Sequence, residues 1–397
     1  MTDVTALLFD PATADAPHEA YRQIRSECPV ARSENLMGDP TVFVSRYADA
    51  MWALRHPEVF SSAPGAINIG QDQPLIPLQV DPPDHAKYRR LLDPEFSPKK
   101  MAALEPDVRM LVNERIDAFV DRGECNFHED LATPFPSAVF LRLMGWPQSD
   151  LEMFLQWRDD TIRPDTDDPD EAVRIRGEAG HAIAQYFEAA LDDRRANPDD
   201  GLLSRLAHAE VDGRPLTKDE SLGICHLLLL AGLDTVTATL DCMVLYLARN
   251  PDRRRQLVDD PSLVPAAVEE LLRWETPVTM VARIVAQDTT FEGVDIKAGD
   301  GCVVMIGAAD DDETEFDDAG TVDFARAANR HVAFGAGPHR CLGSHLARME
   351  LRIALEELHR RIPDYAIADG AEIHHSPGIR QTDHLPLVWT VASAPPS

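Results

Sequence analysis

The sequence predicts a mainly α-helical fold with a minor β region. Three features of the 397 residues indicate this. Long stretches carry apolar residues every three or four positions, whereas runs that suit strands are few and short. A glycine-rich loop with one cysteine leads directly into one of the helical stretches. No internal repeat or low-complexity linker divides the chain, so we expect a single domain over residues 1–397.

These patterns place the elements in chain order. The predicted helices are Glu19–Glu27, Ala48–His56, Pro98–Asp121, Ser149–Arg158, Asp170–Asn197, Lys218–Arg249, Pro265–Glu275 and Gly343–Arg360. The predicted strands are Thr41–Ser45, Arg283–Ala286, Cys302–Ile306 and Leu387–Val391. The acidic, proline-containing segment from Arg163 to Asp170 predicts an exposed loop.

The composition excludes several classes of partner and location. Aspartate and glutamate number 68 against 38 lysines and arginines, a formal net charge of -30. Such a surface repels nucleic acids and anionic membranes, so we expect neither as a partner. The chain begins without the basic and apolar segments of a signal peptide. Its most apolar stretch, Leu227–Leu233, is far too short to span a bilayer.

The cysteines indicate a reducing compartment. They are scattered and form no Cys-x-x-Cys pair: Cys28, Cys125, Cys225, Cys242, Cys302 and Cys341. Such sparse use argues against a disulfide framework or a structural zinc site. We therefore expect a cytoplasmic protein in which five of the six are small apolar core residues.

The loop Phe334–Gly343 holds the remaining cysteine. Gly335 and Gly337 permit positive φ angles and a close backbone approach to a flat group. Cys341 follows at the start of a predicted helix, where free N–H groups and the helix dipole favour a thiolate. A thiolate held there can ligate a metal, including haem iron. The alternative is a buried, inert cysteine in a tight turn.

A second unusual segment interrupts the predicted helix Lys218–Arg249. Gly232 and Asp234 are unfavourable inside an apolar helix, and such conflicts tend to mark functional sites. The absent side chain of Gly232 would leave room for a flat cofactor and a diatomic ligand. The Thr235 hydroxyl can bond to the carbonyl one turn back and loosen the helix, and with Asp234 it could pass protons inward. The alternative is a polar notch in a buried helix.

Both segments resemble signatures of the cytochrome P450 family. The first resembles the haem-binding loop Phe-Gly-x-Gly-x-x-x-Cys-x-Gly, and the second the oxygen-activation motif Ala/Gly-Gly-x-Asp/Glu-Thr. The resemblance implies the P450 fold and a haem b cofactor with Cys341 as the axial metal ligand. It implies that Asp234 and Thr235 are catalytic and handle the protons that activate O2. It also implies cofactor contacts from Phe334, Gly335 and Ala231.

Further basic residues follow the family order. Glu270, Arg273 and Arg326 resemble the family's ion-pair triad, whose role is structural. Four residues resemble those that bind the haem propionates: His85, Arg89, Arg283 and His339. Two carboxylates entering an interior need charge-assisted donors of this kind.

Several pieces are most similar to the camphor-hydroxylating bacterial branch, among them Ile76-Pro77 and the run from Arg361 to Tyr365. That branch hydroxylates compact terpenoids with O2 and takes electrons from a [2Fe–2S] ferredoxin fed by a flavin-containing ferredoxin reductase. The resemblance implies the same partners and a compact, hydrophobic, terpenoid-like substrate. Gln73 stands where the branch presents a tyrosine to the substrate ketone, which argues against camphor itself.

The resemblance also places the substrate pocket, the lid and the docking face. Carried over by position, the pocket contains Gln73, Leu78, Leu227, Leu230, Ala231, Thr279, Val281 and Ile379. It is apolar with one or two hydrogen-bonding groups, as small-ligand sites usually are. The Arg163–Asp170 loop falls where the family covers its active site, and a mobile lid and a plain solvated loop both stay open. Arg89, Arg340 and Arg348 are candidates to meet the acidic surface of the ferredoxin.

The sequence thus predicts a haem-thiolate monooxygenase that hydroxylates a small hydrophobic molecule. The main alternative is a haem-thiolate sensor or gas-binding module, which would share Cys341 but have no need of Asp234 and Thr235. A helical scaffold without haem is the weakest alternative.

Overall fold

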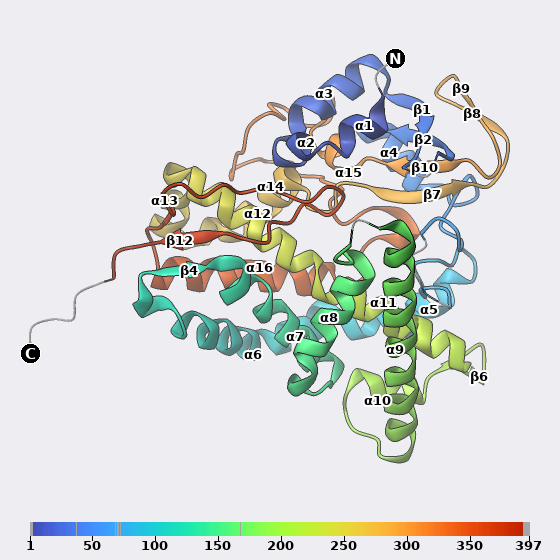
Figure 1. The fold of residues 1–397 in the computed structure, drawn as a ribbon, viewed down its shortest axis with the longest axis horizontal. Helices are drawn as coiled ribbons and strands as arrows, with labels where there is room; N and C mark the ends of the chain where they lie inside the picture. The colour runs from blue at the N-terminus through green and yellow to red at the C-terminus, as the bar shows by residue number, and fades with distance from the viewer. Residues whose placement is uncertain are drawn as a thin grey trace, which may run out of the picture.

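A computed structural model describes residues 3–36, 38–67, 69, 71, 73–166 and 168–391. Most of these residues are helical, with small sheets, as predicted. The five-stranded sheet lies beside α1 to α4 and α15 in the upper right of Figure 1, and the other helices form the larger part below and to the left.

The helices are α1 (Val4–Leu8), α2 (Pro11–Asp15), α3 (Pro17–Glu27), α4 (Tyr47–Arg55), α5 (His85–Leu92), α6 (Pro98–Asp117), α7 (Pro134–Met144), α8 (Leu151–Ile162), α9 (Pro169–Ala196), α10 (Leu202–Ala207), α11 (Lys218–Leu233), α12 (Thr235–Arg249), α13 (Pro251–Asp259), α14 (Val264–Glu275), α15 (Ile306–Asp310) and α16 (Ser344–Arg361). Short 3-10 turns are η1 (Asp93–Phe96), η2 (Val120–Arg122), η4 (Gln148–Asp150), η5 (Pro261–Leu263) and η6 (Gly337–His339), and η3 (His128–Ala132) is a π-helical turn. All the predicted helices are present, with ends displaced by about one turn at most.

The strands are β1 (Val30–Glu34), β2 (Pro40–Val44), β3 (Phe60–Ser61), β4 (Glu124–Asn126), β5 (Glu210–Val211), β6 (Arg214–Pro215), β7 (Val281–Val285), β8 (Thr289–Phe291), β9 (Val294–Ile296), β10 (Gly301–Val304), β11 (Ala366–Ile367) and β12 (Pro386–Val388). The largest sheet has the order β1-β2-β10-β7-β3, and Cys302 at its centre lies opposite Val42 on one side and Arg283 on the other. The predicted strand Cys302–Ile306 is shorter than expected because Ile306 already begins α15.

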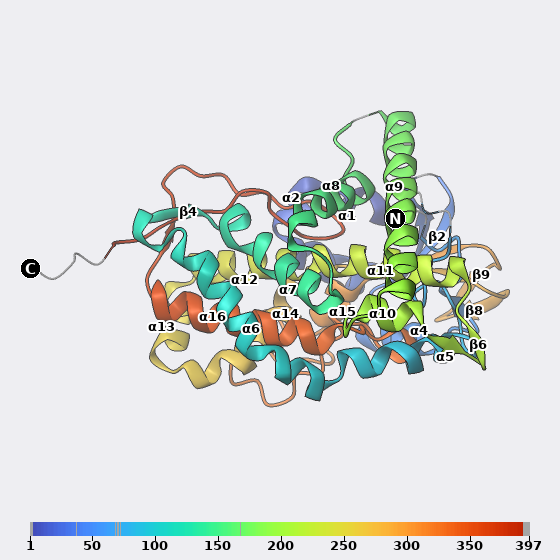
Figure 2. The same ribbon diagram turned by 90° about the horizontal axis from the view of Figure 1, so that it is seen from below.

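The consecutive helices α11 and α12 together form a rod. This rod runs through the middle of the helical part in both views (Figures 1 and 2). Lys218–Arg249 is apolar and long enough to cross a membrane by composition alone, but its apolar window is 78% buried inside the protein. It is therefore a core helix rather than evidence for a membrane span. The rod breaks at Asp234, whose backbone leaves the helical region at φ -122° and ψ -42°. The predicted loosening beside Thr235 is confirmed, and it divides one expected helix into two.

Candidate active site

The cysteine loop folds back tightly on itself and on α4. Gly335 and Gly337 have φ angles of 67° and 68°, as their position in the motif predicts. The Cys341 N–H donates to the Phe334 carbonyl at 2.8 Å, which closes the loop. A Cβ at Gly337 would lie 2.3 Å from the carbonyl oxygen of Leu54 in α4. Only glycine therefore lets the loop pack against the end of α4.

Cys341 differs from the other cysteines in its accessibility. Its side chain is exposed, in contrast to the four buried cysteines Cys125, Cys225, Cys242 and Cys302 and the half-buried Cys28. Burial nevertheless raises the pKa of the Cys341 thiol, against the opposing effect of a Gly343 N–H and three arginines. The expectation that the helix end alone favours a thiolate is thus not met, because desolvation outweighs it. A bound cation would reverse this balance.

Glu269, Arg348 and His331 form an ion-paired cluster, here called the bracket, that supports the cysteine loop. Glu269 of α14 accepts two hydrogen bonds from Arg348 of α16, at 2.7 and 2.9 Å, and lies 3.1 Å from His331 Nε2. Burial alone would raise the pKa of Glu269, but the hydrogen bonds from His331 and Arg348 lower it to about 2. The Arg348 guanidinium also stacks on Phe334, 4.4 Å from the ring centre. The bracket thereby ties α14 and α16 to the first residue of the motif.

The four basic residues predicted to bind propionates gather in one place. The rings of His85 (α5) and His339 (η6) lie 4.4 Å apart. Burial, together with the charges of Arg283, His85 and Arg89, lowers the pKa of His339 to about 3. Arg283 of β7 is buried, and Arg89 of α5 donates to the Arg340 carbonyl beside Cys341 at 2.8 Å.

This cluster fits a dianionic group such as the two propionates of haem. Within the described ranges, the buried Nε2 atoms of His85 and His339 have no hydrogen-bond partner. Among the residues described, the Arg283 guanidinium donates to the Ala282 carbonyl alone, and burial lowers its pKa. Buried donors without acceptors are costly, and carboxylates would satisfy all of them.

Asp234 is buried at the break of the rod and bound by arginines. Arg163, just after α8, donates to its two carboxylate oxygens at 2.8 and 3.2 Å. Arg158 of α8 donates to the Leu233 carbonyl and lies 3.9 Å from the same carboxylate. The Arg163–Asp170 loop is therefore anchored to Asp234 at its first residue. Asp167 in that loop lies outside the described residues.

Thr235 and Ala231 line the accessible side of the rod. Leu227, Ala231 and Thr235 are spaced by four residues, so they share one face. Leu227 and Thr235 are half-buried and Ala231 is exposed, although the rod around them is core. The Thr235 hydroxyl donates to the Ala231 carbonyl at 3.1 Å.

Gly232 has a different role from the one predicted. A Cβ there would lie 2.5 Å from ring carbons of Phe140 in α7. The glycine thus lets α7 pack against the rod, and it does not clear space for a cofactor. The accessible small residue is its neighbour Ala231.

The loop that carries Gln73 and Leu78 crosses the same rod. The Pro74 carbonyl lies so close to Gly223 that a Cβ there would be 2.2 Å from its oxygen, and the Ile76 N–H donates to the Gly223 carbonyl at 3.3 Å. Gly223 is one turn before Leu227, so the loop lies at the end of the accessible face. Gln73 and Leu78 are both half-buried there.

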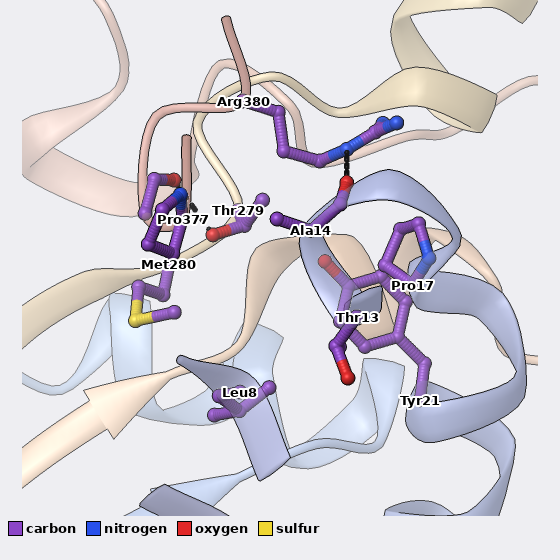
Figure 3. A pocket seen from close by; sticks show the side chains of 10 residues that line it. Leu8, Thr13, Ala14, Pro17, Tyr21, Thr279, Met280, Pro377 and Arg380 are labelled. Carbon is purple, nitrogen blue, oxygen red and sulfur yellow. Dashed lines mark hydrogen bonds between the residues drawn. The ribbon is translucent and has the colours of Figure 1, made fainter. Parts of the chain in front are cut away.

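The other pocket candidates are less uniform. Leu230 is buried, whereas Val281 and Ile379 are half-buried. The Thr279 hydroxyl donates to the Gly378 carbonyl at 2.7 Å and borders a separate cavity of about 10 Å³, shown in Figure 3. That space holds about one water molecule. The Thr279 hydroxyl therefore already donates its proton to the backbone and is not free to donate to a substrate.

The ion-pair triad forms as predicted, away from the accessible face. Arg273 donates to both Glu270 oxygens at 2.8 and 3.0 Å, and Arg326 to one at 2.9 Å. Arg273 also donates to the carbonyls of Asp310, Ala319 and Thr321, which fixes the segment leading to the cysteine loop. This supports a structural role.

Sequence reasoning missed Arg163 and Glu269. Arg163 was placed in an exposed acidic loop, where an arginine among aspartates carries no distinguishing signal. Glu269 precedes the triad glutamate Glu270, and only the fold reveals which of the two faces α16.

Comparison with known proteins agrees with this geometry. Residues 148–361 match the family described as Cytochrome P450. The chain is 36% identical to a steroid C26-monooxygenase of Mycolicibacterium smegmatis, over 95% of this chain and 93% of the relative. It is 33% identical to a methyl-branched lipid omega-hydroxylase of Mycobacterium tuberculosis, over 95% and 92%. The crystal structure of the myxobacterial cytochrome P450 CYP267B1 in complex with myristic acid has a TM-score of 0.90 and 32% identity, covering 97% of this chain and 99% of that one.

The relatives' names concern steroids and lipids, so they do not support the camphor-hydroxylating branch. The family itself is supported along nearly the whole sequence, with the cysteine loop, the broken rod and the basic cluster in their expected places. The chain therefore belongs to the cytochrome P450 family of haem b monooxygenases.

Proposed function

We propose that this monooxygenase hydroxylates an unactivated C–H bond of a hydrophobic small molecule, and that Asp234 and Thr235 deliver the protons. The observation that carries the proposal is the broken rod: a buried acid bound by arginines stands next to an accessible threonine hydroxyl. A sensor or gas-binding module would not need this acid–alcohol pair.

The site residues divide into two roles toward the cofactor. Cys341 would ligate the iron, and the propionates would be held by His85, Arg89, Arg283 and His339. Phe334 and Gly335 belong to the loop that positions the cysteine. The small side chain of Ala231 would leave room for the cofactor beside α11. When bound, haem b supplies the activation of O2, and the thiolate ligand favours O–O cleavage.

The protein's own task is to bring protons to the oxygen site and to keep bulk water out. Arg163 is only partly buried, whereas Asp234 is 1% exposed, so the arginine stands between the carboxylate and solvent. Movement of Arg163 would let Asp234 take up a proton and rotate toward Thr235. Thr235 Oγ1 would then turn from the Ala231 carbonyl to donate its proton.

The substrate is proposed to be a steroid or methyl-branched lipid rather than a compact terpenoid. The named activities of the relatives favour these classes. The aliphatic side chains of Leu78, Leu227, Val281 and Ile379 suit such a ligand, and Gln73 can donate a hydrogen bond to a ketone or carboxylate.

The electron donor is proposed to be a [2Fe–2S] ferredoxin with its flavin reductase, docking near Arg340. Arg340 is exposed, and its charge acts on Cys341. Arg348 is a poorer candidate than its position in the sequence suggested, because Glu269 neutralises it. An open groove of about 290 Å³ between α6, α14 and α16 adjoins this region. We further propose a cytoplasmic location, in keeping with six free cysteines.

The first test is the optical spectrum of the purified protein, reduced under carbon monoxide. A strongly red-shifted Soret band is expected for thiolate ligation by Cys341, and a band without that shift would contradict the assignment. Titration with a 3-ketosteroid, a methyl-branched fatty acid and a monoterpene then identifies the substrate class. A low-to-high-spin shift with the monoterpene alone would refute the steroid and lipid preference.

The second test separates an oxygenase from a sensor. Thr235→Ala should raise the hydrogen peroxide released per NADH oxidised several-fold, because proton delivery is impaired. Ser221→Ala is the matched control, since Ser221 also donates to a carbonyl one turn back in α11, at 3.0 Å. Equal peroxide release from Thr235→Ala and the unaltered protein would favour the sensor.

A further inference from the structure

The π-helical turn η3 grips the beginning of α12 at two points. Thr237 Oγ1 donates to the Ala132 carbonyl at 2.9 Å, and His128 Nδ1 lies 2.7 Å from Asp241 Oδ2. His128 and Ala132 are the two ends of η3. Thr237 and Asp241 are four residues apart, so they stand on the same face of α12. π-Helical turns are rare and are frequently found at functional sites.

The His128–Asp241 contact is a built, interior interaction. The Asp241 side chain is fully buried, and its Oδ1 has no hydrogen-bond partner among the residues described. Thr133 Oγ1 lies 3.2 Å from the other nitrogen of His128 and fixes the ring from behind. In the part of the chain that the structure describes, Asp241 thus has its side-chain hydrogen bond with His128 alone, and loss of that contact would leave a buried carboxyl unpaired.

The contact persists over the neutral pH range. Burial raises the pKa of Asp241 to about 6. Burial alone would lower the pKa of His128, but its hydrogen bond to Asp241 raises it. Arg158, Asp383 and Asp234 are the other charged groups that act on the pair. If His128 holds the shared proton, its N–H donates to Asp241, and if Asp241 holds it, its O–H donates to His128. The hydrogen bond therefore does not require one charge state.

The grip lies directly beside the acid–alcohol pair. Thr235 is the first residue of α12, Thr237 lies in its first turn and Asp241 in its second. Because the rod is broken at Asp234, α11 no longer fixes the rotation of α12 through a continuous backbone ladder. Side-chain contacts from α12 to its neighbours must set the direction in which Thr235 points.

We propose that His128, Asp241 and Thr237 form a clamp on α12 that positions Asp234 and Thr235 for proton delivery. The clamp residues are positioning residues and touch neither substrate nor cofactor. The proposal rests on the function proposed above for Asp234 and Thr235. It adds that contacts from η3, which lies outside the site, set the direction in which Thr235 points.

The test uses the haem-loaded full-length protein with NADH, a [2Fe–2S] ferredoxin and its reductase, and no added substrate. Thr237→Val and Asp241→Leu should each raise peroxide release per NADH oxidised by about two- to tenfold, the factor expected for loss of one hydrogen bond. Amide hydrogen exchange of residues 233–238 should quicken by a similar factor. Asp241→Asn keeps an acceptor for His128 and should restore both values to within about twofold.

The matched control is His359→Leu. His359 is a buried histidine that lies 3.3 Å from the Tyr365 hydroxyl at the far end of α16, and its loss should cost stability without changing peroxide release. If His359→Leu raises peroxide as much as Asp241→Leu, the effect is general destabilisation and the clamp is refuted. Should Asp241→Leu fail to fold, the near-isosteric Thr237→Val decides alone.

Thr235→Ala, measured in parallel, separates the two proposals. If Thr235→Ala raises peroxide but the clamp variants do not, the clamp is wrong and the proposed function stands. If Thr235→Ala has no effect, the proposed function fails, and unchanged exchange in Thr237→Val would then refute the clamp as well.

Discussion

At the residue scale, the cysteine loop depends on one glycine more than on the other. Gly337 combines a positive φ angle with an approach to Leu54 that leaves no room for a Cβ. Gly335 needs only its positive φ, since the nearest atom to its Cβ position is 4.0 Å away. The motif therefore contains one glycine required for conformation and one required for both conformation and contact.

Gly337→Ala is accordingly expected to lower the free energy of unfolding by at least about 2 kcal/mol, from backbone strain and overlap together. Gly343→Ala, two residues after the cysteine, is the control: its φ is -81° and nothing lies within 4 Å of its Cβ position. Urea unfolding of both variants measures the difference. Equal stability of the two would show that the loop yields more easily than the contact implies.

Sequence reasoning was right about residue types here and wrong about one direction. It predicted positive φ at Gly335 and Gly337, and the grouping of His85 with His339, because each follows from a pattern along the chain. It misjudged Gly232, since helix periodicity does not say which neighbouring helix meets which face. Phe140 decides that, and it lies far from Gly232 in the sequence.

At the scale of elements, the Gly232–Phe140 contact sets the spacing between α7 and the rod. Gly232→Ala should force the two helices apart and lower the free energy of unfolding by about 1–3 kcal/mol. The double variant Gly232→Ala/Phe140→Leu should recover part of that loss, because leucine is smaller than the phenylalanine ring and leaves room for the added methyl group. Gly177→Ala in α9, with nothing near its Cβ position, should instead stabilise by up to about 1 kcal/mol. Thermal unfolding distinguishes these signs.

The bracket between α14 and α16 predicts a pH dependence of stability. The folded pKa of Glu269 is lowered to about 2. Its ion pairs therefore contribute stability that is fully present above the unfolded value of about 4.3 and is lost as the pH falls toward about 2. Glu269→Gln should cost about 1–3 kcal/mol at pH 7, and the cost should shrink between about pH 4 and pH 2.

Urea unfolding at pH 7 and at pH 3.5 measures this difference between variant and parent. Glu178→Gln is the control, since the Glu178–Arg174 pair in α9 is exposed on both sides and such pairs contribute little. A Glu269→Gln penalty that stays constant down to pH 3 would contradict the assigned ion pairing.

At the scale of the whole molecule, the helical architecture follows from the sequence, and the connections that complete the site do not. Long amphipathic or apolar segments such as α9 and α11 can be located from local periodicity alone. The short elements η3 and α15 have five residues each, too few to show a helical period, and they are defined by tertiary contacts, so no local pattern predicts them. Arg163, Glu269 and the His128–Asp241 pair belong to this second class, because their partners are distant in the sequence.

The net charge predicts how the rate of electron delivery depends on salt concentration. The proposed ferredoxin, with an acidic surface, would meet a chain of net charge -30, so long-range repulsion would oppose a local attraction at Arg340. The Debye length is about 30 Å at 0.01 M salt and about 8 Å at 0.15 M. Added salt first screens the repulsion between the whole molecules and only later the contact at Arg340. The rate of the first electron transfer should therefore rise and then fall between about 0.01 and 0.5 M NaCl.

Arg340→Glu should convert this bell shape into a monotonic rise, because only the repulsive part is left. Arg255→Glu makes the same charge change elsewhere and should keep the bell shape at a slightly lower rate. Arg255 is exposed beside Arg254, which pairs with Asp364 just beyond the end of α16. Arg340 lies just before the start of this 18-residue helix, which is about 27 Å long, so Arg255 and Arg340 lie near its opposite ends. Stopped-flow reduction under carbon monoxide measures the rates, and the same salt profile in both variants would remove Arg340 from the docking site.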